Sequence, residues 1–192
     1  MTQIWHNSNW SALAYLPERA RSILQYSGSL TEALQKRFDS DDIKISVEDS
    51  RIERATPKIN QLLDITDNEI LKRIVVISIG PKPYIYAETC APCWATEELP
   101  WLADLGHSAL GQYLFSLPNV ERSEFRYALL DLSQLEVDFI FEQDITLWAR
   151  RSLFQVPGKT VDKVPLLVTE VFMHHVAPSI VSESFSGAEY YC

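Results

Sequence analysis

A single glutamate interrupts an apolar stretch near the end of the chain. Glu170 is the only charged residue between Pro165 and Met173. In a strand it would share one face with Val168 and Phe172, and the opposite face is apolar as well. This pattern predicts a central strand that is covered on both sides. A carboxyl group there must be paired, hydrogen-bonded or protonated, because burying a bare carboxylate is very unfavourable.

Two interpretations of Glu170 follow from these residues. In the structural one, Glu170 forms an ion pair with Arg150 or Arg151, which lie on opposite faces of the preceding predicted strand. In the functional one, Glu170 is a carboxyl group held in an apolar cavity, where it can pass a proton to a ligand. The sequence leaves both open.

A second candidate is a pair of cations in the apolar segment Leu71–Ile77. Arg73 would share a strand face with Val75 and Ile77, and Lys72 would lie on the opposite face. We expect one of these cations to point inward. An inward arginine offers a planar fork that binds a carboxylate through two hydrogen bonds. The alternative is an arginine at a strand end that extends to solvent.

The overall charge limits what such residues can bind. The chain of 192 residues has a formal net charge of -9, which predicts a surface that repels nucleic acid and acidic membranes. An anionic ligand would therefore need a local basic site. The first ten residues lack the pattern of a secretory signal, and no apolar run reaches the roughly 18 residues that span a bilayer. We expect a cytoplasmic protein without membrane insertion.

The cysteine and glycine patterns favour no metal and no cofactor. Cys90 and Cys93 form a Cys-x-x-Cys that could be a redox pair or half of a zinc site. Zinc would need two more ligands, and His174-His175 is the only other cluster. Because the neighbourhood looks antiparallel rather than βαβ, we expect the cysteines to pack at a strand end. The sequence has no phosphate-binding glycine loop and no Gly-x-Ser-x-Gly or His-Glu-x-x-His motif.

The elements that must position these residues form an antiparallel α+β pattern. Residues 10–38 predict an αα-hairpin, in which Gly28 ends the first helix and Ser29 or Thr31 caps the second. Residues 97–115 predict a helix interrupted near Gly106. Strands are predicted at 43–47, 70–79, 84–90, 125–132, 137–142, 147–156 and 164–173, with turns at 64–67, 80–83 and 157–159. Hairpin-joined strands with helices grouped elsewhere indicate this fold class. With no repeat or linker, residues 1–192 predict a single domain.

Three segments together resemble the chorismate lyase family. Ser29-Leu30-Thr31 is similar to the family's Ser-(Leu/Met)-Thr. Residues 105–115, Leu-Gly-His-Ser-Ala-Leu-Gly-Gln-Tyr-Leu-Phe, resemble its Leu-Gly-x-x-x-Leu-Gly-x-Tyr-Leu-Phe. Residues 147–172, with Leu-Trp-Ala-Arg-Arg-Ser and Pro-Leu-Leu-Val-Thr-Glu-Val-Phe, resemble its closing hairpin. Order and spacing hold from about residue 10 to 173, which leaves residues 177–192 as an extra tail.

The resemblance implies an antiparallel sheet of about six strands, with flanking helices that cover a buried ligand site. It also implies a monomeric, cofactor-independent enzyme that eliminates pyruvate from chorismate to give 4-hydroxybenzoate, the first committed step towards ubiquinone. Leu30 matches a position whose backbone contacts the ligand, and Leu110 matches the leucine of the Leu-Gly-x-Tyr segment. Arg73 matches the arginine that binds the ring carboxylate, and Glu170 matches the glutamate at the 4-oxygen. Arg73 and Glu170 are thus the implied catalytic residues.

The chain departs from the family pattern in several places. Glu88 stands where the family commonly has arginine, which would reverse a charge near the site. Residues 160–164 lengthen the last hairpin turn, and residues 116–145 form a longer segment than expected. One extra residue in the turn at 80–83 would place Lys72 rather than Arg73 at the carboxylate.

The alternative function is a non-catalytic domain that binds an aromatic carboxylate, related to the effector-binding domains of transcription regulators. Such a domain normally follows a basic winged-helix segment, and none fits before residue 30.

Overall fold

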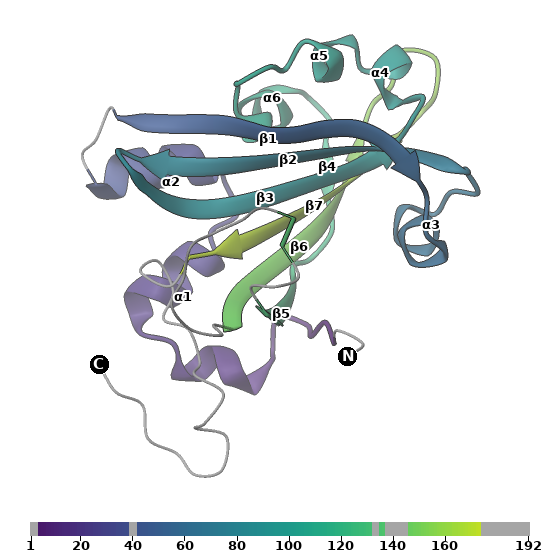
Figure 1. The fold of residues 1–192 in the computed structure, drawn as a ribbon. Coiled ribbons are helices and arrows are strands. Elements are labelled where there is room, and N and C mark those ends of the chain that lie inside the picture. Colours follow the sequence, from purple (N-terminus) through teal and green to yellow (C-terminus); the bar gives the residue numbers. More distant parts are fainter. Residues whose placement is uncertain (1–3, 39–41, 132–134, 137–145, 174–192) are drawn as a thin grey trace.

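The computed structural model describes residues 4–38, 42–131, 135–136 and 146–173, and its centre is a seven-stranded antiparallel sheet (Figure 1). The strand order is β1-β2-β3-β7-β6-β4, and β5 also pairs with β6. The strands are β1 (Ile43–Arg54), β2 (Glu69–Ile79), β3 (Lys82–Pro92), β4 (Glu121–Arg122), β5 (Arg126–Asp131), β6 (Thr146–Val156) and β7 (Val164–Phe172). The antiparallel α+β prediction is confirmed. The two-residue strand β4 was not predicted, and the strand predicted at 137–142 lies outside the described residues.

β7 lies in the middle of the sheet, between β3 and β6. Leu166 and Val168 pack against the helices that follow β3, whereas Leu167 packs on the opposite face against the helix that follows β1. The prediction of a central strand that is covered on both sides is therefore confirmed. A strand of this kind holds Glu170 rigidly, because its backbone is hydrogen-bonded on both sides.

The register of the sheet groups the polar residues of four strands on one face. Arg73 is paired with Thr89, Thr89 with Val168, and Val168 with Ser152. Directly paired residues of neighbouring antiparallel strands point to the same side of the sheet. Glu170 follows Val168 by two residues and therefore points to the same side, as does its paired residue Arg150.

Short helices cover both faces of the sheet. On the side of Arg73 and Glu170 lie α2 (Leu30–Phe38) and α6 (Leu110–Ser116). The other helices are η1 (Ser11–Tyr15), α1 (Glu18–Leu24), α3 (Pro57–Leu63), α4 (Ala95–Glu98) and α5 (Pro100–Ala103). No helix among the described residues is long and apolar enough to cross a membrane.

The helical hairpin predicted over residues 10–38 is broken further than expected. Pro17 separates η1 from α1, because a proline and the residue before it cannot continue a helix. α1 ends at Leu24, well before Gly28, so the prediction that Gly28 ends this helix was wrong. Ser29 rather than Thr31 caps α2, since its Oγ accepts the N–H of Glu32 at 3.4 Å.

Three further elements differ from what the sequence predicted. The interruption predicted near Gly106 in the helix at 97–115 is confirmed, since the chain turns there with a φ of +48°. The part before it is divided once more, because Pro100 begins a new helix, so three short helices replace the predicted one. The helix α3 was not predicted, although Thr56 accepts a cap hydrogen bond from Ile59 and Pro57 occupies the first helical position. β1 also runs on past residue 47 to residue 54, still alternating in exposure.

Candidate active site

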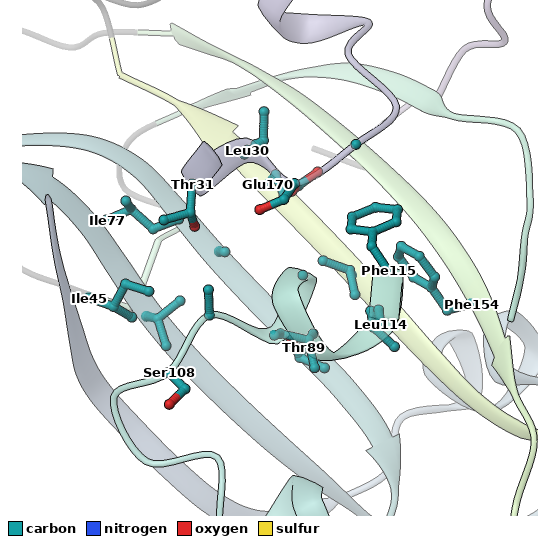
Figure 2. A pocket seen from close by; sticks show the side chains of 18 of the residues that line it. Leu30, Thr31, Ile45, Ile77, Thr89, Ser108, Leu114, Phe115, Phe154 and Glu170 are labelled. Carbon is teal, nitrogen blue, oxygen red and sulfur yellow. The ribbon is translucent and has the colours of Figure 1, made fainter. Parts of the chain in front are cut away.

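A cavity of ≈ 60 Å³ lies between the sheet and the first turns of α2 and α6 (Figure 2). All four residues that the resemblance singled out, Leu30, Arg73, Leu110 and Glu170, line this cavity. Its charged lining residues among those described are Arg73, Arg122 and Glu170, and much of the remaining wall is apolar. A covered cavity with a few charged groups in a largely apolar wall is typical of a small-molecule site rather than of a polymer site.

Arg73 extends from β2 into the wall of the cavity. The residue is only 7% exposed, and its Nη2 donates to the carbonyl oxygens of Gly106 at 2.7 Å and Ser108 at 3.3 Å. Burial lowers the pKa of Arg73 below its usual value. No described residue accepts a hydrogen bond from Nε or Nη1, so these donors are available to an anion. Through its Nη2 hydrogen bonds, Arg73 also holds the loop that leads into α6.

Lys72 points to the opposite face of the sheet, as strand alternation predicts. Its Nζ lies 3.3 Å from Glu88 and 3.6 Å from Glu53, and it also forms an ion pair with Glu136. Burial acts to lower the pKa of Lys72, but the hydrogen bond to Glu136 and the three carboxylate charges outweigh it and raise the pKa. Arg73 and not Lys72 thus faces the cavity. The expectation that Glu88 reverses a charge near the site was wrong, since Glu88 pairs with Lys72 on the far face.

Glu170 has one feature of each interpretation that the sequence left open. Its Oε2 accepts a hydrogen bond at 2.6 Å from Nε of Arg150, whose side chain is fully buried. The same carboxyl group also lines the cavity, close to Leu30 and Thr31 at the start of α2 (Figure 2). The surroundings of Glu170 are therefore not simply apolar, as the functional interpretation assumed.

The two adjacent arginines of β6 have different roles. Arg150 also donates through Nη1 to the carbonyl oxygens of Leu24 at 2.9 Å and Tyr26 at 2.5 Å, which ties the end of α1 to the sheet. Arg151 lies on the other face, with its guanidinium 4.2 Å from the centre of the Trp5 ring. The partner of Glu170 is therefore Arg150.

Arg122 is a cavity residue that sequence reasoning missed. Its Nε donates to Ser152 Oγ at 2.9 Å, its Nη1 donates to the carbonyl oxygen of Ser27 at 2.8 Å, and its Nη2 lies 3.9 Å from Glu170. Burial and the nearby charge of Arg150 lower the pKa of Arg122 to about 10, although Glu170 acts in the opposite direction. Arg122 lies in a two-residue strand within a segment that has no clear periodicity, so no local signal could have identified it.

Leu30 and Leu110 occupy equivalent places in two different helices. Each is the first residue of its helix, α2 or α6, and each lines the cavity. The N–H groups of a first helical turn have no acceptor within the helix and carry partial positive charge. Together with Arg73, these backbone donors make the covered side of the cavity suited to an anion.

Cys90 and Cys93 do not line this cavity. Cys90 is buried and packs with Leu63, Ile70 and Leu167, and both cysteines are free thiols. Burial, and secondarily the charge of Glu88, raises the pKa of the Cys90 thiol well above its usual range, which disfavours the reactive thiolate. Within the described ranges there is no cluster of three His, Cys, Asp or Glu side chains that could hold a metal ion, and the His174-His175 pair lies outside them.

Comparison with known proteins gives relatives over nearly the full length of the chain. The model of the chorismate lyase family matches residues 2–183. A probable chorismate pyruvate-lyase of Psychromonas ingrahamii is 30% identical over 181 residues, which cover 90% of this chain and 94% of that protein. Another, of Nitrosospira multiformis, is 33% identical over 194 residues and covers 91% and 95%. A chorismate pyruvate-lyase of Salmonella gallinarum is 29% identical over 156 residues and covers 75% and 78%.

The fold is shared more widely than the sequence. The effector domain of PhnF from Mycobacterium smegmatis superposes with a TM-score of 0.52 at 14% identity, covering 77% of this chain and 90% of that one. At such low identity this likeness concerns the fold alone. The family model and the full-length relatives decide the assignment: this chain belongs to the chorismate lyase family.

Proposed function

We propose that this protein is a chorismate lyase, which eliminates pyruvate from chorismate and releases 4-hydroxybenzoate. The observation that carries the proposal, beyond family membership, is that Leu30, Arg73, Leu110 and Glu170 line one cavity although they come from four different elements. The cavity has cationic and backbone donors for an anion and apolar walls for a ring.

The reaction requires few catalytic groups from the protein. The bond between the ring carbon and the ether oxygen breaks, the ring loses one proton, and the leaving enolate gains one to become pyruvate. Because the ring becomes aromatic, the reaction is strongly downhill and needs no cofactor. The protein must orient the substrate, exclude water and assist proton transfer.

Arg73 binds the ring carboxylate in this proposal. Its Nε and Nη1 donate to no described residue, while the carbonyl oxygens of Gly106 and Ser108 hold Nη2 and so orient the guanidinium. The N–H groups at the start of α6, which follows the loop that Arg73 holds, add further donors to the same anion. This arrangement fixes one end of the ring.

Glu170 acts at the other end of the ring. As a carboxylate paired with Arg150, it accepts a hydrogen bond from the 4-hydroxyl group of the substrate. It is the only carboxyl group among the described cavity residues. We therefore assign to it the acceptance of the proton that the ring loses and the delivery of that proton to the leaving enolate.

The cover of the cavity bears on turnover. Because the starts of α2 and α6 cover part of the cavity, we propose that their movement accompanies product release, and we expect release to limit the rate. We further infer that the enzyme works as a monomer in the cytoplasm.

The direct test is incubation of purified protein with chorismate and no added metal or nucleotide. We expect 4-hydroxybenzoate and pyruvate in equal amounts, measured by absorbance or mass and by a coupled lactate dehydrogenase assay. Arg73→Ala serves as the control for the site. Chorismate that binds but stays intact would instead support the non-catalytic binding domain.

A further inference from the structure

The cavity has a second cation at the end opposite Arg73. Arg73, Thr89, Val168 and Ser152 form one row across β2, β3, β7 and β6, and Arg122 is hydrogen-bonded to Ser152. Three strand spacings separate the ends of this row, or about 14 Å between backbones. Both arginine side chains line the cavity, whose floor between them includes Thr89 and Val168.

The donors of Arg122 are only partly used. Nε binds Ser152, and one N–H of Nη1 binds Ser27. Nη2 is 3.9 Å from Glu170, beyond hydrogen-bond distance, and no described residue accepts a hydrogen bond from it. Three of the five N–H groups of this guanidinium, one on Nη1 and both on Nη2, therefore have no acceptor among the described residues and can bind a ligand.

The charges around the cavity leave two cations without a matching anion. Glu170 is the partner of Arg150, which is fully buried and ion-paired at 2.6 Å. Arg73 and Arg122 then carry two positive charges toward the cavity. The side chain of Arg122 is 15% exposed, and the rings of Phe125 and Phe154, with centres 4.0 Å and 4.8 Å from its guanidinium carbon, compensate part of its charge. An anion in the cavity would compensate the rest.

We propose that Arg122 binds the second carboxylate of chorismate, the one on the enolpyruvyl group. The assignment rests on the proposed function. Chorismate is a dianion with one carboxylate on the ring and one on the side chain that leaves. With the ring carboxylate at Arg73, the ether side chain extends toward Glu170 and Arg122. Arg122 holds the leaving group, and the product, which has no second carboxylate, loses this contact.

Binding of stable ligands tests the assignment without turnover. The probes are 3-(carboxymethoxy)-4-hydroxybenzoate and 3-ethoxy-4-hydroxybenzoate, which have side chains of similar size but only one of which has the second carboxylate. By calorimetry, the parent protein should bind the carboxymethoxy compound about 10- to 100-fold more tightly. In Arg122→Gln this preference should fall below about threefold, while 4-hydroxybenzoate should bind within about threefold of the parent. Arg122→Lys should retain part of the preference.

The matched control is Arg151→Gln. Arg151 is a similarly buried arginine, and burial and the nearby Arg126 lower its pKa to about 10, but it lies over Trp5 outside the cavity. This variant should leave all three affinities unchanged. A parent protein without preference for the carboxymethoxy compound would overturn the assignment with no variant needed. An Arg122→Gln protein that keeps the preference for the carboxymethoxy compound, or that loses affinity equally for all three ligands, would also overturn the assignment. A parent protein that shows the preference yet leaves chorismate intact would refute only the lyase function.

Discussion

Replacing Glu170 by glutamine separates its contribution to folding from its contribution to chemistry. Arg150 is fully buried, and Glu170 is its only counter-charge within 4 Å among the described residues. Removing one partner of such a pair costs about 3–5 kcal/mol. Glutamine keeps an oxygen that accepts the Arg150 hydrogen bond, and the carbonyl oxygens of Leu24 and Tyr26 remain. We therefore expect a smaller loss for Glu170→Gln, about 2–3 kcal/mol.

This loss should be visible as a lower melting temperature. For a chain of this size about 2–4 °C is lost per kcal/mol, so Glu170→Gln should melt about 4–12 °C below the parent. A carboxyl group held only in an apolar cavity, as the functional interpretation assumed, could be replaced by glutamine with little loss of stability. The Arg150 ion pair changes that expectation, because the same carboxylate both pairs with Arg150 and lines the cavity.

Turnover should fall much further than stability. Glutamine can still hydrogen-bond a 4-hydroxyl group, so the affinity for 4-hydroxybenzoate should stay within about tenfold of the parent. It cannot transfer a proton, so turnover of chorismate should drop by about 10²–10⁴-fold. The assay compares thermal melts, product affinity and turnover below the melting range of the variant. Full turnover with a lowered melting temperature would show that Glu170 is structural only, and an unchanged melting temperature would show that the ion pair contributes little to folding.

Three further results are expected. In titration calorimetry, Arg73→Ala should weaken 4-hydroxybenzoate binding by about tenfold to a few hundredfold. Lys72→Ala should lower the melting temperature and leave the affinity within a few-fold, because Lys72 pairs with carboxylates on the far face. The reverse pattern would place Lys72 at the site. Replacing both Cys90 and Cys93 by serine should keep activity within a few-fold of the parent. In the parent, a thiol reagent should label Cys93 before Cys90, since burial raises the pKa of Cys90. Mass spectrometry measures the labelling, and faster labelling of Cys90 would contradict this. Hydrogen bonds from Thr160, and secondarily from the backbone of Val161, lower the pKa of Glu98. The contribution of the Glu98 carboxylate to folding stability is therefore present above its ordinary pKa of 4.5 and is lost as pH falls through the lower pKa of the folded state. The difference in melting temperature between the parent and Glu98→Gln should shrink toward pH 3 in calorimetry, and a difference that stays constant would refute this direction of the pKa shift.

The Glu98 contacts also account for a departure from the family pattern. The backbone N–H groups of Thr160 and Val161 both donate to Glu98 Oε2, at 2.6 Å and 3.2 Å. The longer turn between β6 and β7 is thus held by α4, and it does not line the cavity.

Strand alternation made much of the site predictable from the sequence. It placed Arg73 and Lys72 on opposite faces, and it identified the segment around Glu170 as a central strand. Both inferences use a period of two residues, which is a local property of extended backbone. The resemblance in the closing hairpin and at the two helix starts added Leu30 and Leu110.

Only the tertiary structure decided which groups meet. The choice between Arg150 and Arg151 as the partner of Glu170 depends on the register of β6 against β7, which the sequence does not display. The place of Arg122 depends on β4, two residues long, pairing with β6 beside Ser152. The far-face position of Glu88 depends on its pairing with Ile74 rather than Arg73. Each of these facts comes from hydrogen bonds between residues far apart in the chain, and no local periodicity encodes them.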